Sequence, residues 1–302
     1  MSDTPAVSVV MSVRNVAKYV DLAIESVLGQ TFSDFEFLIV DDGSKDATDK
    51  ILKDYARRDT RIRILTGPER GLSMALNLGI SEARAPLLAR MDGDDICLPT
   101  RFEKQVAYMR DHAECVLVGC RCELIDPEGR PIHEKPDTPL YHEQIDYLLL
   151  RMRWPIVHPA AMIRADAVAK TGGYLEKYLT VEDHDLFLKL AEIGKLANVD
   201  EVLLKYRQHF KSTVYTTAHS QSKNLVEIIT AACERRGIPV PQEVHLRPVE
   251  NVSEATHRRN WAWRALAAGN LATARHHAWG ALRAAPFSPE SWRATICAIR
   301  GR

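Results

Sequence analysis

The sequence predicts an α/β fold in which helices flank a mostly parallel β-sheet, followed by an all-helical C-terminal extension. Over the first 120 residues, short β-branched apolar runs alternate with stretches of helical periodicity. Acidic residues directly follow several of these runs, and the last 80 residues have small residues at helical spacing. We therefore expect an α/β domain over residues 1–217 and a helical extension over residues 218–302.

The first predicted strand, Val7–Val13, is nearly continuously apolar, as is typical of a buried parallel strand. The helix that follows places six apolar residues on one face, from Tyr19 to Leu28. Later strands are expected at Phe35–Val40, Arg61–Leu65 and Pro86–Met91, and helices around Ile51–Tyr55, over Leu72–Ala83 and from about Pro99. This alternation indicates βαβ units and a Rossmann-like parallel sheet with right-handed crossovers.

The pattern is less regular after Val118, although the chain still offers individual elements. A turn is expected at Gly129–Pro131 and a final strand at Val199–Tyr206. Helices are expected at Ile145–Met152, Ala161–Ala169 and Asp185–Ile193, and a linker at Ser212–Ala218.

The C-terminal extension has the small-residue spacing of a tetratricopeptide helix pair. That spacing follows the break at Gly237–Pro241 and involves Trp261, Ala262, Ala265, Ala274, Ala278, Ala281 and Pro286. Because one repeat cannot bury its own face, we expect it to pack on the α/β domain or on a second copy, as a homodimer. A helical cap is favoured over a peptide-binding groove.

Composition and charge exclude some classes of protein. Hydrophobic residues make up 46% of the 302 residues and charged residues 26%, an ordinary globular mixture. The net charge of zero argues against a dedicated nucleic-acid binder. The charge is uneven, however, because Arg258–Arg302 holds eight arginines against one acid, Glu290. Peripheral contact of these basic helices with an anionic membrane is one interpretation, and a solvated face is the other.

The six cysteines show no CxxC pair, and Cys120 and Cys122 are expected to be buried strand residues. The first residues lack the pattern of a signal peptide, and no apolar run approaches the roughly 18 residues of a membrane span. The sequence therefore predicts a cytoplasmic protein with reduced thiols, peripheral at most to the inner face of the cell membrane.

Polar residues gather where the predicted strands end. Six of them stand at the ends of three strands, namely Asn15, Asp41, Asp42, Asp92, Asp94 and Asp95. In open parallel sheets the carboxyl ends of strands meet at one edge, where ligands bind. Asp92-Gly-Asp94 suits a hard divalent cation, Mn²⁺ or Mg²⁺, that neutralises a diphosphate. The alternative for this cluster is a cap for the next helix.

Six segments, in order, resemble family 2 glycosyltransferases, which have the GT-A fold. The resemblance covers roughly residues 5–212 and rests on VSVVMSVRN (Val7–Asn15), AIESVLGQTF (Ala23–Phe32), LIVDDGS (Leu38–Ser44), GLSMALN (Gly71–Asn77), MDGDD (Met91–Asp95) and VEDHDL (Val181–Leu186). It implies transfer of a sugar from a nucleotide-sugar donor, with a UDP-sugar favoured, to a glycan or lipid-linked acceptor. Bacterial surface polysaccharide synthesis is the expected setting.

The resemblance also implies roles for individual residues. The donor would contact Ser12, Arg14, Asn15, Asp42, Asn77 and Asp92, with Asp42 bonded to the base. Asp94, Asp92 and His209 would hold the metal. Family members often have an aromatic residue at the position of Arg14 that helps to hold the base, so this departure bears on the choice of nucleotide.

An acceptor hydroxyl is a poor nucleophile near neutral pH, so a positioned carboxylate assists its attack. Glu182, Asp183 and Asp185 lie together at a predicted helix start, where by themselves they would only stabilise the helix dipole. The resemblance makes Asp183 the general base, ahead of Glu182, in a displacement that inverts the anomeric centre. It also places His158 and Gly172–Tyr174 near the acceptor.

Two other functions compete with this one. A sugar-phosphate nucleotidyltransferase would need a glycine-rich phosphate loop after the first strand, and Val13–Val16 contains no glycine. A non-catalytic helical-repeat adaptor would tolerate loss of the acidic residues, which are intact here.

Overall fold

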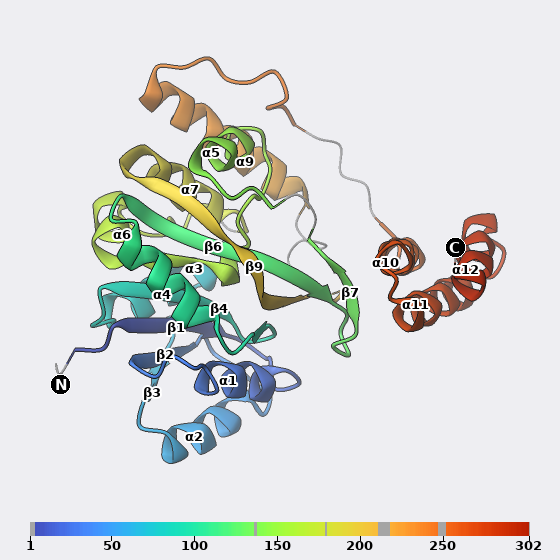
Figure 1. The fold of residues 1–302 in the computed structure, drawn as a ribbon, viewed down its shortest axis with the longest axis horizontal. Helices are drawn as coiled ribbons and strands as arrows, with labels where there is room; N and C mark the ends of the chain where they lie inside the picture. The colour runs from blue at the N-terminus through green and yellow to red at the C-terminus, as the bar shows by residue number, and fades with distance from the viewer. Residues whose placement is uncertain (1–3, 136–137, 179, 211–217, 247–251, 302) are drawn as a thin grey trace.

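The computed structural model describes residues 4–135, 138–178, 180–210, 218–246 and 252–301. Four parallel strands form one half of the sheet, namely β1 (Val7–Val13), β2 (Phe35–Asp41), β3 (Ile62–Thr66) and β4 (Leu87–Asp92), in the order β3-β2-β1-β4. Ser12 pairs with Asp92 and Val13 with Asp41, so both acidic strand ends lie beside the end of β1. The predicted parallel α/β sheet is confirmed (Figure 1).

Helices cover both faces of this sheet because its central strands are buried on both sides. Met11 and its odd-numbered neighbours in β1 pack with α1 (Val20–Leu28), α2 (Thr48–Arg58) and α4 (Arg101–Asp111). Val10 instead faces α3 (Leu72–Ser81) and the helices beyond it. This two-sided burial explains why the strands are nearly continuous apolar runs.

The other half of the sheet is mixed. It runs β4-β8-β6-β9-β5, with β5 (Ile96–Cys97), β6 (Cys115–Ile125), β8 (Met162–Arg164) and β9 (Lys195–Arg207), while β7 (Pro131–Glu134) pairs with β6. Strand β8 is antiparallel to both β4 and β6, whereas β9 is parallel to β6. Cys120 and Cys122 are buried in β6, as predicted, and all six cysteines are free.

The predicted helix Ala161–Ala169 is wrong at its start. Met162–Arg164 forms β8, and α6 covers only Ala165–Thr171. Ile163 pairs with Leu88 on one side and with Leu117 on the other, so strand pairing overrides the helical propensity of this alanine-rich segment. The remaining elements of this half are α5 (His142–Leu149), η1 (His158–Ala160) and α7 (Glu182–Ile193).

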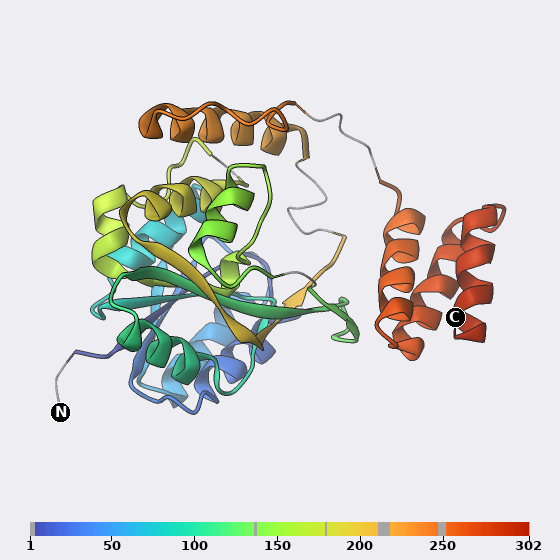
Figure 2. The same cartoon turned by 45° about the horizontal axis from the view of Figure 1, so that its top comes forward.

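Within the described residues, four helices follow β9, namely α9 (Ala218–Arg236), α10 (Glu254–Ala267), α11 (Leu271–Ala284) and α12 (Pro289–Arg300). Helix α9 lies along α5 and α7 and buries Ile228 and Ile229 in their shared core (Figure 2). The other three form a separate bundle whose inner faces are mostly alanine. The predicted linker Ser212–Ala218 lies outside the described residues, except for Ala218, where α9 begins.

The bundle packs on the α/β domain, as one of the two expected arrangements. Trp261 of α10 shares a hydrophobic cluster with Leu124 of β6 and Ile132 of β7. This contact buries the face of α10 without a second copy, so the homodimer stays a prediction. Within the described residues, no helix is both long and apolar enough to cross a bilayer.

Candidate active site

Asp42 organises the loop that covers the end of β2. Its carboxylate is buried and accepts hydrogen bonds from the backbone N–H groups of Glu69, at 2.7 Å, and Gly71, at 3.0 Å. Gly67 has no room for a side chain, because a Cβ there would lie 2.7 Å from the Asp42 Cα. Asp42 therefore holds residues 67–71 beside the strand ends, and its predicted contact with a nucleotide base stays a prediction.

Asn15 fixes the neighbouring loop after β1. Its backbone is left-handed, with φ 54°, and its Oδ1 accepts a hydrogen bond from the Lys45 N–H at 2.7 Å. Its own N–H donates to the Ser44 Oγ at 3.0 Å. Ser12 lies just before it in β1, and Arg14 is exposed beside it. All three predicted donor-binding residues therefore lie at the same sheet edge as Asp42.

Asn77 of α3 holds the turn at Gly172–Tyr174. Its amide donates to the Tyr174 carbonyl at 2.7 Å, and its Oδ1 accepts from the Tyr174 N–H at 3.0 Å. A Cβ on Gly173 would lie 2.8 Å from that Oδ1, and this residue has a positive φ of 70°. The structure thus places Asn77 in a positioning contact, and its predicted contact with the donor stays a prediction.

The acidic residues after β4 form one cluster. Asp92, Asp94 and Asp95 each offer a carboxylate oxygen, and these atoms lie within 4.8 Å of one another. Asp95 is fully buried; its Oδ1 accepts the Arg207 N–H at 2.7 Å, while its Oδ2 has no hydrogen-bond partner. Burial and repulsion by its neighbours raise the pKa of Asp95, and burial also raises that of Asp92. The chain leaves this cluster short of positive charge, so these residues fit a divalent cation.

His209 lies at this cluster, and its predicted role as a metal ligand stays a prediction. Its Nε2 is 3.0 Å from the Asp94 Oδ2, and its ring stacks on Tyr19 with centroids 5.8 Å apart. Arg207 donates from Nε to the Asp94 carbonyl at 2.7 Å. The end of β9 and the residues just after it therefore bring two side chains, Arg207 and His209, to the acids at the end of β4.

Arg90 is a central residue that sequence reasoning missed. Its side chain is 5% exposed and forms an ion pair with Asp92. The same positive charge lowers the pKa values of Glu182 and Asp183, opposing the effect of their burial. Arg90 thus lies between the cation cluster and the second acidic pair. The available signal was a charged residue inside the otherwise apolar strand Leu87–Met91.

Glu182 and Asp183 begin α7 and are almost completely buried. Burial, with repulsion from Asp183, raises the pKa of Glu182 to about 7, and burial raises that of Asp183 to about 6. The Oδ1 of Asp183 also accepts the His184 N–H at 2.8 Å. A carboxylate that titrates near neutral pH can accept a proton from a hydroxyl group.

His158 is partly buried, and its ring contacts Phe187 of α7 edge-on. Its Nε2 lies 2.7 Å from the Tyr174 hydroxyl, and burial together with the charge of Arg90 lowers its pKa well below the usual value. The ring is therefore neutral at physiological pH. Its observed contact supports the Tyr174 side chain, whose backbone Asn77 holds.

The chain has clear relatives among known proteins. A sequence profile described as glycosyl transferase family 2 matches residues 8–172. The O-antigen biosynthesis glycosyltransferase WbnJ of Escherichia coli is 38% identical over 212 residues, which cover 68% of this chain and 81% of WbnJ. The putative glycosyltransferase EpsE of Bacillus subtilis is 31% identical, covering 82% of this chain and 88% of EpsE. The amylovoran biosynthesis glycosyltransferase AmsE of Erwinia amylovora is 34% identical, covering 66% and 75%.

Solved structures share the fold at low sequence identity. S. aureus TarS 1–349 in complex with UDP-GlcNAc has a TM-score of 0.60 and 15% identity, covering 98% of this chain and 81% of TarS 1–349. The mannosyltransferase PcManGT from Pyrobaculum calidifontis, in complex with GDP-Man and Mn²⁺, has a TM-score of 0.58 and 17% identity, covering 99% and 86%. The expected GT-A fold is thus confirmed.

Proposed function

Because this chain belongs to glycosyl transferase family 2, we propose that it transfers a sugar from a nucleotide-sugar donor to an acceptor hydroxyl with inversion. The observation that carries the proposal is the pairing of two acidic sites across Arg90. One site, Asp92–Asp95, sets three carboxylates against the single guanidinium of Arg90, and the other, Glu182–Asp183, titrates near neutral pH. A cation site beside a base is the combination that direct displacement of a nucleoside diphosphate requires.

The donor would lie along the strand ends, with its base near Asp42 and Asn15 and its diphosphate near the acidic cluster. Asp92, Asp94 and His209 would hold Mn²⁺ or Mg²⁺, which when bound neutralises charge on the leaving diphosphate. The buried Oδ2 of Asp95 supports a cation there, because this oxygen has no hydrogen-bond partner and a buried polar atom without one is costly. The complex of PcManGT contains Mn²⁺ and GDP-Man.

Asp183 would act as the general base. The acceptor oxygen attacks the anomeric carbon, the bond from that carbon to the diphosphate oxygen breaks, and the hydroxyl proton passes to the Asp183 carboxylate. Attack from the face opposite the leaving group inverts the centre. The pKa of Glu182 is raised to about 7, so this neighbour gives up its proton less readily than Asp183. While Glu182 is protonated, no second negative charge lies beside the base.

Bacterial surface polysaccharide is the proposed product. WbnJ and AmsE are named for O-antigen and amylovoran biosynthesis. TarS was solved with UDP-GlcNAc and PcManGT with GDP-Man, so both nucleotides belong in any donor screen. We favour a UDP-sugar as donor and a glycan or lipid-linked acceptor.

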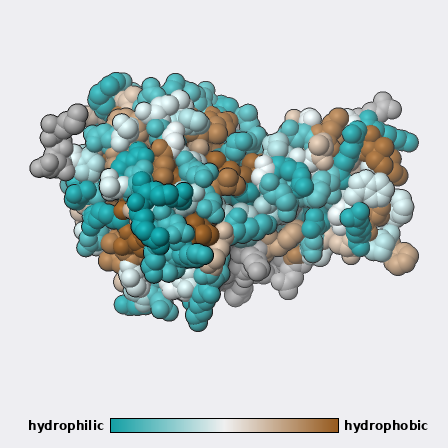
Figure 3. Space-filling view, turned by 90° about the horizontal axis from the view of Figure 1, so that it is seen from below, coloured by the Kyte–Doolittle hydropathy of each residue, from teal (hydrophilic) through white to brown (hydrophobic). Residues whose placement is uncertain are grey.

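We also propose that the C-terminal bundle contacts the anionic inner face of the cell membrane. Its outer surface exposes Phe287, 96% accessible, together with Trp279, Trp292, Ile296 and Ile299, and hydrophobic residues are visible there in Figure 3. The same bundle carries most of the excess arginines. Basic residues attract anionic lipid while aromatic rings enter the interface. The alternative of a solvated face predicts no co-sedimentation of the protein with anionic vesicles at low salt.

The proposed activity is tested by a thermal-shift screen of nucleotide sugars with Mn²⁺, followed by hydrolysis of the donor that binds. A transferase releases nucleoside diphosphate slowly in the absence of acceptor. A nucleotidyltransferase would instead exchange the nucleotide with pyrophosphate, and an adaptor would do neither. No diphosphate release with any stabilising donor would contradict the proposal.

A further inference from the structure

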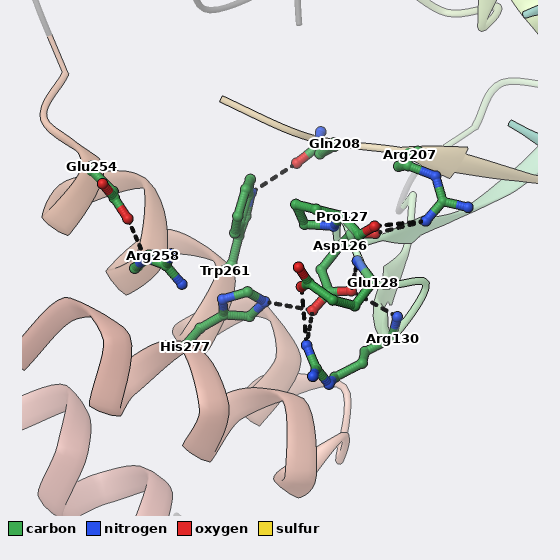
Figure 4. A network of polar contacts seen from close by, with 10 residues as sticks. All are labelled: Asp126, Pro127, Glu128, Arg130, Arg207, Gln208, Glu254, Arg258, Trp261 and His277. Carbon is green, nitrogen blue, oxygen red and sulfur yellow. Dashed lines mark hydrogen bonds and ion pairs between the residues drawn. The ribbon is translucent and has the colours of Figure 1, made fainter. Parts of the chain in front are cut away.

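The C-terminal bundle contacts the catalytic domain at the segment that reaches the acidic cluster. Strand β9 ends at Arg207, Gln208 and His209 follow it, and His209 lies against Asp94. The indole N–H of Trp261 in α10 donates to the Gln208 Oε1 at 3.0 Å (Figure 4). Trp261 is 1% exposed and stacks on Phe210 with ring centroids 5.1 Å apart. The bundle therefore holds the residues on both sides of His209.

A second set of contacts starts at His277 of α11. Its Nε2 lies 3.1 Å from the Oδ2 of Asp126, which follows β6 and is fully buried. Asp126 also accepts hydrogen bonds from the N–H groups of Glu128 and Arg130, and from the Arg130 side chain. These bonds fix the conformation of the turn at residues 126–130, and therefore the orientation of its carbonyl groups.

The turn at residues 126–130 holds the side chain of Arg207. The Arg207 Nη1 donates to the carbonyls of Asp126, at 3.1 Å, and Pro127, at 3.3 Å (Figure 4). Its Nε donates to the Asp94 carbonyl at 2.7 Å, and its backbone N–H donates to the Asp95 Oδ1 at 2.7 Å. Both sets of contacts thus end at Asp94 and Asp95.

We propose that the C-terminal bundle positions the metal site, through Trp261 and His277, and so sets the affinity of the enzyme for its cation. This inference rests on the proposed function, since it requires a cation at Asp94. Side chains that bind a metal gain affinity when surrounding contacts fix their orientation before binding, and loss of such contacts typically weakens binding about 10- to 100-fold. Trp261 and His277 are positioning residues, because neither touches the cluster itself.

The test replaces Trp261 by Phe, which keeps an aromatic ring against Phe210 and removes the N–H that bonds Gln208, together with part of the buried indole ring. Trp263→Phe is the matched control, because Trp263 lies on the same helix and its ring faces Arg293 of α12. Mn²⁺ binding in the presence of UDP is followed from the electron paramagnetic resonance signal of free Mn²⁺. We expect Trp261→Phe to raise the half-saturating Mn²⁺ concentration about three- to tenfold, the effect of one hydrogen bond. Trp263→Phe should leave it unchanged.

His277→Gln tests the second set of contacts and carries the test if Trp261→Phe does not fold. It should also raise the half-saturating Mn²⁺ concentration, with turnover at saturating Mn²⁺ close to that of the unmodified enzyme. Unchanged Mn²⁺ affinity in the folded variants would overturn the positioning role. Equal Mn²⁺ binding by Asp94→Asn and the unmodified enzyme would instead overturn the proposed metal site, so the two failures are distinguishable.

Discussion

The acids after β4 and the acid after β6 have opposite surroundings. Asp126 is held by His277, Arg130 and two backbone N–H groups, and these hydrogen bonds lower its pKa although burial alone would raise it. Asp92 and Asp95 have raised pKa values, and one oxygen of Asp95 has no partner. Both regions bring three potential metal-ligating side chains close together, Asp126 with His276 and His277 in the second case.

Charge balance, rather than ligand geometry, therefore distinguishes a binding site from an anchor. The guanidinium of Arg130 lies 2.9 Å from the Asp126 carboxylate and already neutralises it. A cation bound at Asp126 would be repelled by Arg130. In the cluster after β4, by contrast, Asp95 forms no ion pair with a basic side chain of the described residues. The same residue types thus attach the bundle to the domain at Asp126, and they form the proposed cation site at Asp92–Asp95.

The largest expected effect is on turnover, which should distinguish the acids with a raised pKa from Asp126, whose pKa is lowered. Asp183 belongs to the class with a raised pKa, and Asp183→Asn removes the proton acceptor while keeping its size. Turnover should fall by about two to four orders of magnitude, with donor affinity nearly unchanged. Asp126→Asn should keep turnover at saturating Mn²⁺. Glu182→Gln is the control: a dead Glu182→Gln beside an active Asp183→Asn would move the base by one residue.

The next expected effect is on stability, and here Asp126→Asn is the variant expected to differ from the unmodified protein. Asp126→Asn leaves Arg130 and His277 without their charged partner, and should lower the free energy of unfolding in urea by about 1–3 kcal/mol, because Arg130 is partly exposed and solvent screens its charge. Because its folded-state pKa is depressed, the contribution of Asp126 is complete well above pH 4 and is lost as the pH falls below the unfolded value of about 3.9. A variant as stable as the unmodified protein at pH 7 would show that Asp126 is no anchor.

A smaller effect concerns the pH dependence of turnover. Glu182 and Asp183 have pKa values of about 7 and about 6, so the pair loses its two protons in succession between about pH 5 and 8. A general base acts only when deprotonated, so kcat should rise roughly tenfold per pH unit below about pH 6 and level off above about pH 7. The pH–rate profile at saturating donor and Mn²⁺ measures this. A flat profile from pH 5 to 9 would remove the pair from the chemistry.

The sequence predicted the first half of the fold better than the second for a physical reason. Strands β1, β2 and β4 are buried on both faces, so their apolar runs stand out without any knowledge of the fold. Strand β8 has three residues and exists only because β4 and β6 pair with it. Such a strand has no local signal that could outweigh the helical propensity of its neighbours.

The candidate site divides in the same way. Asp42, Asp92 and Asp94 were found because they follow strands, where ligands bind. Arg90 lies inside a strand, and the contact between Asp126 and His277 joins residues 151 positions apart. Arg90 has only the signal of a charge inside an apolar strand, and the contact between Asp126 and His277 has none, so only the folded chain shows what these residues connect.

Mn²⁺ binding in the presence of UDP, measured by calorimetry, tests the central claim most directly. The account predicts binding to the unmodified protein and to His276→Ala, because the cluster at Asp126 holds no cation. It predicts loss of both Mn²⁺ binding and Mn²⁺-dependent UDP binding in Asp94→Asn, since Asp94 would hold the ion. Binding that survives in Asp94→Asn and disappears in His276→Ala, or UDP affinity that is equal in excess chelator, would contradict the account.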